Sequence, residues 1–335
     1  MTGDASPPPV GGGPAPPTNS GPAGSGVFSL EGRPAPGLYL VAWLLAGLGL
    51  AVSFIATLAE APAAGVLLMV GLLMLVGGLS AGAGYQILAR AARPPEAYRG
   101  PSPPLLFGLV FVLVNAVGLG LTAVGVGDIQ TPLGLLVGAV ILVLGYVLAV
   151  WLFVVRSGAL SWRDMGLPGR GSLQNAIGDA ATAAGLMLPV TFVAVVGGGI
   201  VAVLLDAAPQ SVVPAPTTSV EAVAVAIAAV VLVPIGEEVL FRGYALTAWL
   251  RDLGPRQALI RSTALFAVIH VANVQSATFD EGLRQAAVTL AVIAPLGAVL
   301  GWLYLQRGLV GAIAGHITYN GILLFLQFTF VTPIG

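Results

Sequence analysis

The sequence predicts an all-α polytopic membrane bundle of about eight or nine transmembrane helices. The first observation behind this prediction is the composition. Of 335 residues, 57% are hydrophobic and only 8% are charged, whereas a soluble domain carries about 25% charged residues. The second is that apolar runs of about 20 residues recur from residue 37 onward, each long enough to cross a ~30 Å hydrocarbon layer as a helix. The runs are continuous rather than alternating, which favours helices over a barrel.

Several function classes are excluded by composition and motif content. The net charge of −1 is no signature of a nucleic-acid partner. Cysteine is absent, which excludes disulfides, thiolate metal sites and cysteine nucleophiles. No serine lies in a GxSxG turn between a strand and a helix, since the stretch Gly78-Leu79-Ser80-Ala81-Gly82 falls inside a predicted span. No phosphate loop or dinucleotide fingerprint precedes a strand. The chemistry must therefore come from the few polar side chains inside the apolar runs.

Three regions follow from the order of these runs. Residues 1–36 are rich in Pro, Gly and Ser and should be disordered, since they bury too little apolar surface to offset their chain entropy. Residues 37–155 hold four predicted spans, and 156–335 form the predicted core. At the start of that core, residues 157–176 connect the fourth and fifth spans and should carry a short interfacial helix. The predicted spans are 37–59, 63–88, 104–126, 132–155, 177–205, 220–250, 257–276, 285–305 and 309–330.

Arginines gather in alternate connections between the predicted spans. Loops that bear arginine are cytoplasmic by the positive-inside rule, so nine spans predict a cytoplasmic N-terminus and an external C-terminus. The arginines concerned are Arg90, Arg93, Arg99, Arg156, Arg163, Arg170, Arg251, Arg256 and Arg307. The intervening loops carry Glu60, Asp128, Asp206 and Asp280, with Arg284 the basic exception near them.

Small residues at four-residue spacing predict close helix packing. The pairs are Gly78 and Gly82, Gly297 and Gly301, and Gly311 and Gly315.

The stretch Val233–Arg251 carries three ionisable residues inside an apolar run: Glu237, Glu238 and Arg242. Such groups are costly at membrane depth and mark function by default. Glu238 and Arg242 are four residues apart, so on a helix they can pair. A buried ion pair that only fixes packing is the structural alternative. Glu237 weakens that alternative, because its carboxylate has no partner nearby in the sequence.

The two histidines of the chain, His270 and His316, lie in later apolar runs, each followed within one turn by an asparagine, Asn273 and Asn320. Packing is again the alternative. A carboxylate beside an imidazole can deprotonate water, and an asparagine or second histidine can stabilise the oxyanion formed at an attacked carbonyl. Together these groups suffice for peptide hydrolysis without a covalent nucleophile.

A divalent metal such as zinc is the rival use of the same groups. Glu237, His270 and His316 with one open position would suit a catalytic zinc ion. The HExxH helix motif is missing, however, and the ligands would have to converge from three spans. The residues leave open whether any metal is required.

Three motifs in order resemble the CAAX prenyl protease 2 and bacteriocin-processing family, known as CPBP or Abi. They are Glu237-Glu238-x-x-x-Arg242, Phe266-x-x-x-His270 and His316-x-x-x-Asn320. The resemblance covers about residues 160–325. It implies an intramembrane endopeptidase, either a metalloprotease or a metal-independent glutamate protease, in the cytoplasmic membrane of a bacterium.

The same resemblance implies a role for each residue. Glu237 would activate water with the assistance of His270, His316 and Asn320 would hold the oxyanion, and Glu238 with Arg242 would support the site. The expected partners are the lipid bilayer and a membrane-associated peptide or protein substrate, with no requirement that it be prenylated. Two other functions remain open: a non-catalytic scaffold or bacteriocin-immunity protein, and a proton-coupled transporter. The transporter predicts internal repeats, which the sequence does not display.

Overall fold

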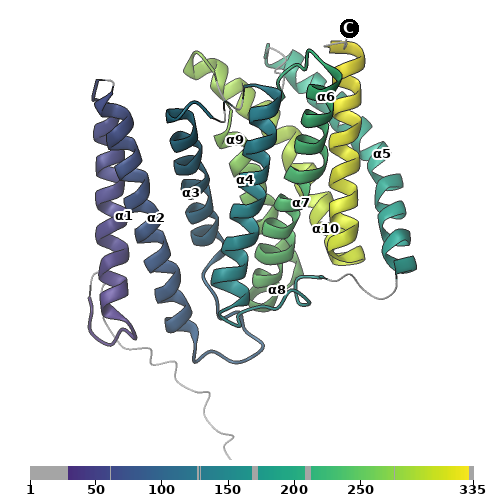
Figure 1. The fold of residues 1–335 in the computed structure, drawn as a ribbon. Helices are drawn as coiled ribbons and strands as arrows, with labels where there is room; N and C mark the ends of the chain where they lie inside the picture. The colour runs from purple at the N-terminus through teal and green to yellow at the C-terminus, as the bar shows by residue number, and fades with distance from the viewer. Residues whose placement is uncertain are drawn as a thin grey trace, which may run out of the picture.

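The computed structural model describes residues 29–60, 62–126, 128, 130–167, 173–207, 213–274 and 276–331. These residues form a polytopic helical bundle without a strand (Figure 1), which confirms the predicted fold class. Residues 1–28 of the predicted disordered tail, and Arg170, lie outside the described residues. The bounds are α1 (Pro36–Ala56), α2 (Ala63–Arg90), α3 (Pro103–Ala123), α4 (Pro132–Val150), η1 (Trp151–Val155), α5 (Leu173–Leu204), α6 (Ser219–Ala226), η2 (Ile227–Leu232), α7 (Val233–Glu238), η3 (Val239–Leu246), α8 (Thr247–Leu253), α9 (Pro255–Ala272), α10 (Phe279–Leu326) and η4 (Gln327–Val331).

Seven helices in the described part of the chain are long and apolar enough to cross a membrane. The last of them, Phe279–Phe330, contains two predicted spans and is interrupted at Gly308, where φ is 71° and ψ is −170°. The seven therefore correspond to eight of the nine predicted spans. The remaining predicted span, 257–276, corresponds to α9, an 18-residue helix that is not among the seven.

Helix starts and stops follow local chemistry. Proline opens α1, α3, α4 and α9, where its missing N–H has no helical partner to lose. Thr218 caps α6 in a reciprocal capping box with Glu221. Gly254, at φ 76°, separates α8 from α9. This positive φ is a conformation that glycine adopts without steric cost, and it turns the chain back into α9 beside the site.

Ion pairs tie the arginine-bearing connections together at one end of the bundle. Arg93 contacts Asp252 at 3.1 Å, joining the α2–α3 connection to α8. Arg251, the neighbour of Asp252, contacts Asp164 at 3.1 Å in the α4–α5 connection. This is the lower end in Figure 1, opposite the end of α10. The clustering agrees with the arginine pattern, while the orientation in a membrane remains a prediction.

The prediction of a short helix in the α4–α5 connection is wrong, because residues 162–166 form turns instead. Ser161 donates from its backbone N and its Oγ to Asp164 Oδ2, at 2.7 and 2.8 Å. Gly166 then adopts φ 87°, which ends the turn. Burial raises the pKa of Asp164, but the hydrogen bonds from Ser161 and the charge of Arg251 outweigh it, so the pKa is lowered overall.

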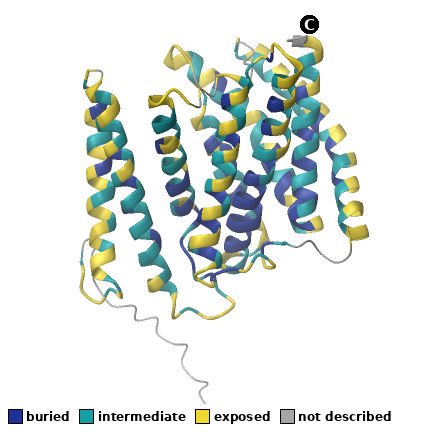
Figure 2. Cartoon of the chain, viewed as in Figure 1, coloured by how far each residue is buried: buried dark blue, intermediate teal, exposed yellow. Residues whose placement is uncertain are grey.

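Burial is concentrated in the middle of the bundle (Figure 2). All eight residues of η3 are buried, whereas only 6% of the apolar window of α1 is buried. Helix α1 packs chiefly along α2 and leaves apolar side chains exposed, as a lipid-facing helix does. The continuous helix from α6 to α8, which carries the acidic pair, is therefore central.

Close helix approach is confirmed at Gly78, Gly297 and Gly301, whereas a Cβ at Gly82 would meet only ordinary contacts at 3.7 Å. A Cβ at Gly297 would lie 3.0 Å from the Phe266 ring, and one at Gly78 would lie 2.5 Å from the backbone nitrogen of Ala46. At Gly78 a side chain would collide with the backbone of α1, and at Gly297 it would require the Phe266 ring to shift. The Gly297 contact positions α10 against the ring that borders the site.

Candidate active site

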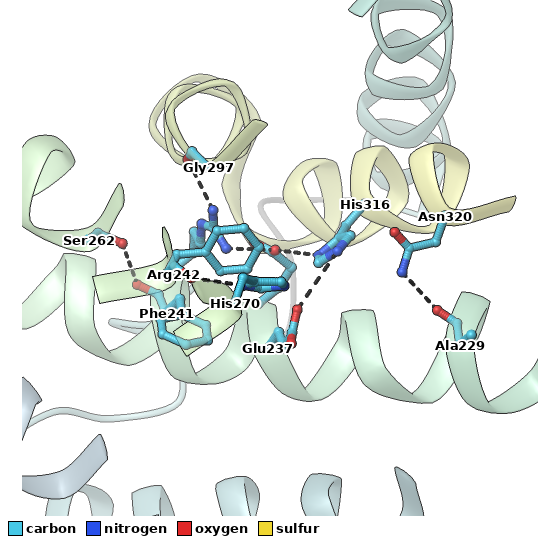
Figure 3. Close-up of polar contacts among 11 residues, drawn as sticks. Ala229, Glu237, Phe241, Arg242, Ser262, His270, Gly297, His316 and Asn320 are labelled. Atoms are coloured by element: carbon cyan, nitrogen blue, oxygen red, sulfur yellow. Dashed lines mark hydrogen bonds and ion pairs between the residues drawn. The ribbon is translucent and has the colours of Figure 1, made fainter. Parts of the chain in front are cut away.

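The predicted pair of Glu238 and Arg242 is present and completely buried. Arg242 Nη1 donates to Glu238 Oε1 at 2.9 Å, and neither side chain is accessible to solvent. Arg242 Nη2 donates to the carbonyl oxygen of Gly297 at 3.0 Å (Figure 3). The guanidinium carbon lies 4.3 Å from the centre of the Phe266 ring, a favourable cation–π distance. The cation is therefore held on three sides by two other helices and its own.

Arg242 lies in η3, a π-helical segment within the long central helix. A π-helical turn inserts an extra residue and displaces backbone groups from their α-helical partners. Two hydroxyl groups donate hydrogen bonds to backbone carbonyl oxygens of this segment. Ser262 Oγ donates to Phe241 O at 2.9 Å, and Thr247 Oγ1 donates to Arg242 O at 3.4 Å. The irregular segment is thereby tied to α9 at the site.

His316 bridges the two glutamates. Its Nδ1 donates to Glu238 Oε1 at 2.8 Å, and its Nε2 lies 3.8 Å from Glu237 Oε2. The Glu238 carboxylate accepts hydrogen bonds, so it fixes the proton on Nδ1 and aims Nε2 at Glu237. The Glu238 Oε1 atom thus serves both Arg242 and His316. The Glu237 side chain keeps 12% exposure and is the more accessible of the two carboxylates.

His270 shares the Phe266 ring with His316 but has a different hydrogen-bond partner. The ring centre of Phe266 is 4.4 Å from that of His270 and 5.9 Å from that of His316. His270 Nδ1 donates to the carbonyl oxygen of Phe266 at 2.8 Å, which leaves Nε2 of the neutral ring as an acceptor. The imidazole that the structure places beside Glu237 is thus that of His316.

The two asparagines behave differently. Asn320 Nδ2 donates to the carbonyl oxygen of Ala229 in η2 at 2.8 Å, which fixes its side chain on the same side of the bundle as His316 (Figure 3). Asn273 is exposed at the C-terminal end of α9. The described structure therefore brings Asn320 into the site region and leaves Asn273 outside it.

The metal candidates do not form a ligand set. In the part of the chain that the structure describes, no group of three or more His, Cys, Asp or Glu side chains is arranged to hold a metal ion. The Nδ1 hydrogen bonds of His270 to Phe266 and of His316 to Glu238 leave Nε2 of each ring available, so these bonds do not decide the question. It is the arrangement of Glu237, His270 and His316 that does not form a three-ligand zinc site.

One contact of the candidate site is not predicted from the sequence: the carbonyl of Gly297, which accepts from Arg242. Its only sequence signal was the spacing of Gly297 and Gly301, which predicted packing rather than a polar contact. Backbone acceptors carry no side-chain signature, so residue types alone do not reveal them.

Comparison with known proteins supports the resemblance for part of the chain. Residues 219–322 match the family described as type II CAAX prenyl endopeptidase Rce1-like. Neither a curated protein nor a solved structure matches the chain. The matched segment begins at the start of α6 and ends inside α10, so it contains all six polar site residues. Residues 219–322 are therefore similar to the Rce1-like family, in agreement with the resemblance that the three motifs carry.

Proposed function

We propose that this integral membrane protein is an intramembrane endopeptidase that hydrolyses peptide bonds of membrane-associated substrates with water activated by Glu237. One observation carries the proposal: Glu237 Oε2 lies 3.8 Å from His316 Nε2 inside a buried polar cluster. General bases and oxyanion donors act on two oxygens bound to the same carbon, so they must lie within a few ångströms of each other. The Glu237–His316 distance meets that requirement.

The reaction follows from these positions. Glu237 accepts a proton from water while the water oxygen bonds to the substrate carbonyl carbon, and the carbonyl electron pair moves to oxygen. His316, held at Nδ1 by Glu238, in its protonated form donates from Nε2 to that oxyanion. The carbon–nitrogen bond then breaks, and the proton on Glu237 passes to the departing nitrogen. Atoms and charge balance without a metal or a covalent enzyme intermediate.

The remaining residues support this step. His270 Nε2, left as an acceptor by the bond to Phe266, is proposed to assist in holding the water. Asn320 has a second amide N–H besides the one donated to Ala229, and is proposed as the second oxyanion donor. Glu238 and Arg242 hold His316 rather than touching the substrate.

The test uses purified protein in nanodiscs with two probes: a farnesylated peptide ending in a CAAX sequence, and the same peptide without the lipid. Products are followed by mass spectrometry. We expect the parent to cleave and Glu237→Gln to lose cleavage while melting normally, since the change removes only the base. His316→Ala should lower the rate by about 10²–10³-fold. Cleavage by Glu237→Gln at the parental rate would refute the mechanism.

Two further comparisons decide the finer points. Cleavage of both probes would mean that the lipid is not needed. Loss of activity with a chelator, and recovery with zinc, would identify the metal-dependent subtype; unchanged activity would support the glutamate subtype. If the parent cleaves neither probe, membrane proteomics compares cells that express the parent with cells that express Glu237→Gln. A peptide that is shortened only in the cells with the parent identifies the substrate. Full biological function of Glu237→Gln without any cleavage would favour the scaffold.

A further inference from the structure

Helix α5 precedes the matched segment and packs chiefly against α10 (Figure 1). Helix α4, by contrast, packs on the central helix, where a Cβ added at Gly236 would lie 3.0 Å from Val143 Cγ2. Only 11% of the apolar window of α5 is buried, so few contacts determine where it lies. Those contacts fall on both parts of α10, residues 279–307 before the break at Gly308 and residues 309–326 after it.

Asp179 attaches α5 at the break itself. It is the one charged residue of α5 and lies inside the predicted span 177–205, where an ionisable group marks a partner or a function by default. Its partner is Arg307, whose Nη1 donates to Asp179 Oδ1 at 3.3 Å. Arg307 is the last residue before Gly308. The Asp179 side chain is 19% exposed, so this pair is screened less than two charges in open water.

The segment that contains α5 also contacts the part of α10 that carries the imidazole. Leu309, the first residue after the break, lies against the α4–α5 connection, where a Cβ added at Gly166 would lie 3.3 Å from Leu309 Cβ. Further along, Met187 of α5 is fully buried. A Cβ added at Gly315, the neighbour of His316, would lie 3.3 Å from Met187 Cγ. Helix α5 is therefore packed one residue away from the imidazole.

The C-terminal half of α5 contacts the first part of α10. A Cβ added at Gly198 would lie 2.6 Å from Val292 Cγ2, so the two helices approach closely here. At the far end, Arg284 Nη1 lies 3.7 Å from Asp206 Oδ2 and donates to the Asp206 carbonyl oxygen at 3.3 Å. This contact gives a partner to Arg284, the basic exception among the intervening loops. Helix α5 thus spans both parts of α10.

We propose that Asp179 is a positioning residue for His316, because it ties α5 across the break of α10. Two helical parts joined at one glycine change their angle by rotation about that residue, and contacts from α5 to both parts restrict the rotation. The angle sets where His316 Nε2 lies relative to Glu237 Oε2, 3.8 Å away. The inference rests on the function proposed above, since it gives α5 a part in holding the oxyanion donor.

The test is Asp179→Asn, which removes the charge and keeps the shape of the side chain. We expect an unchanged KM and a fall in kcat of about tenfold, because a misplacement of about 1 Å can cost roughly 10²-fold in rate. Asp179→Glu keeps the charge and should restore kcat. Loss of stability alone would lower the folded yield without changing the kcat of the folded protein.

Asp206→Asn is the matched control. It also breaks an ion pair between α5 and α10, but far from the break and with a fully exposed carboxylate, so kcat should stay at the parental value. Arg307→Gln breaks the Asp179 pair from the other side and should lower kcat as Asp179→Asn does. It provides the measurement if Asp179→Asn does not fold.

A second readout needs no substrate. The chain has no cysteine, so Leu290→Cys with Phe325→Cys places one spin label on each part of α10, at exposed positions about equally far along the chain from Gly308. Electron paramagnetic resonance measures the distance between the labels. We expect one narrow distance distribution in the labelled parent, a broader or second one after Asp179→Asn, and no change after Asp206→Asn.

The two readouts separate this inference from the proposed function. If the label distance changes but the parent cleaves no peptide, the proposed function fails and the restraint of the break by α5 stands. If the parent cleaves, and Asp179→Asn changes neither kcat nor the label distance, the inference is wrong and the proposed function stands. A changed distance with an unchanged kcat would also overturn the inference, because the bend would then not determine where His316 acts.

Discussion

Replacing Arg242 by alanine tests whether the buried pair supports the fold. Arg242 has no solvent exposure and contacts Glu238 at 2.9 Å and the Gly297 carbonyl at 3.0 Å. Without it, Glu238 remains a buried charge whose Oε2 already has no partner among the described residues. Removing one member of a buried pair costs about 3–5 kcal/mol in soluble proteins. We expect a loss of that order in the free energy of unfolding.

Unfolding of the purified protein in mixed micelles of increasing SDS content measures this loss. Arg251→Ala is the matched control, because Arg251 also pairs with a carboxylate, at 3.1 Å, but is 28% exposed. A pair of this kind contributes about 0–1 kcal/mol. The double variant Glu238→Gln/Arg242→Met removes both charges and should recover much of the loss, since a buried pair replaced by neutral groups of similar size is often tolerated.

The reasoning is refuted if Arg242→Ala unfolds at the same SDS fraction as the parent while activity is lost. Arg242 would then act on the reaction directly. Equal losses in Arg242→Ala and the double variant would also contradict it, because the stranded charge on Glu238 would not be the cause. In that case the lost bond to Gly297 and the lost packing on Phe266 would account for the effect.

Three other predictions follow from the fold. Reporter fusions after Arg93 and Arg307 should report cytoplasm, and one after the last residue of α10 should report the outside; a cytoplasmic signal there would contradict the topology. Gly236→Ala should cost about 1–3 kcal/mol by overpacking α4, measured by SDS unfolding, whereas Gly243→Ala should be tolerated because its nearest neighbours lie at 3.6 Å. Asp164, whose pKa is lowered by folding, should stabilise the protein above its unfolded pKa of about 3.9, by less than ~1 kcal/mol because it is partly exposed. The melting difference between parent and Asp164→Asn should therefore vanish as pH falls through the lowered pKa, and a difference that persisted at lower pH would exclude this linkage.

The features that were predicted correctly depend on residues close together in the sequence. Apolar runs set the helices because backbone groups in lipid must be satisfied within the segment. The pair of Glu238 and Arg242 followed from helical spacing alone. The break at Gly308 falls between two predicted spans, where the apolar run is interrupted by Arg307.

Contacts between segments that are distant in the sequence were not predicted. The partner of His316 is Glu238, 78 residues away in the chain, and no spacing rule selects His316 over His270 as the imidazole beside Glu237. The π-helical turns of η3 were also not predicted. Nor was the hydrogen bond from Ser262 to the Phe241 carbonyl in that segment, which joins residues 21 apart in the chain. The approach of α4 at Gly236 is likewise tertiary. The division at residue 156 remains a prediction, although α4 packs across it onto α6 and α7.

The sequence left two uses of the Glu238–Arg242 pair as alternatives: packing or chemistry. In the structure one oxygen atom, Glu238 Oε1, accepts from Arg242 at 2.9 Å and from His316 at 2.8 Å. Arg242 is fixed in turn by Gly297, in the part of α10 before the break at Gly308, whereas His316 lies in the part after it. Glu238 Oε1 therefore joins the two parts of α10, through Arg242 and through His316. The pair is structural, and through His316 it also sets the geometry of the proposed site, so the two uses are not exclusive.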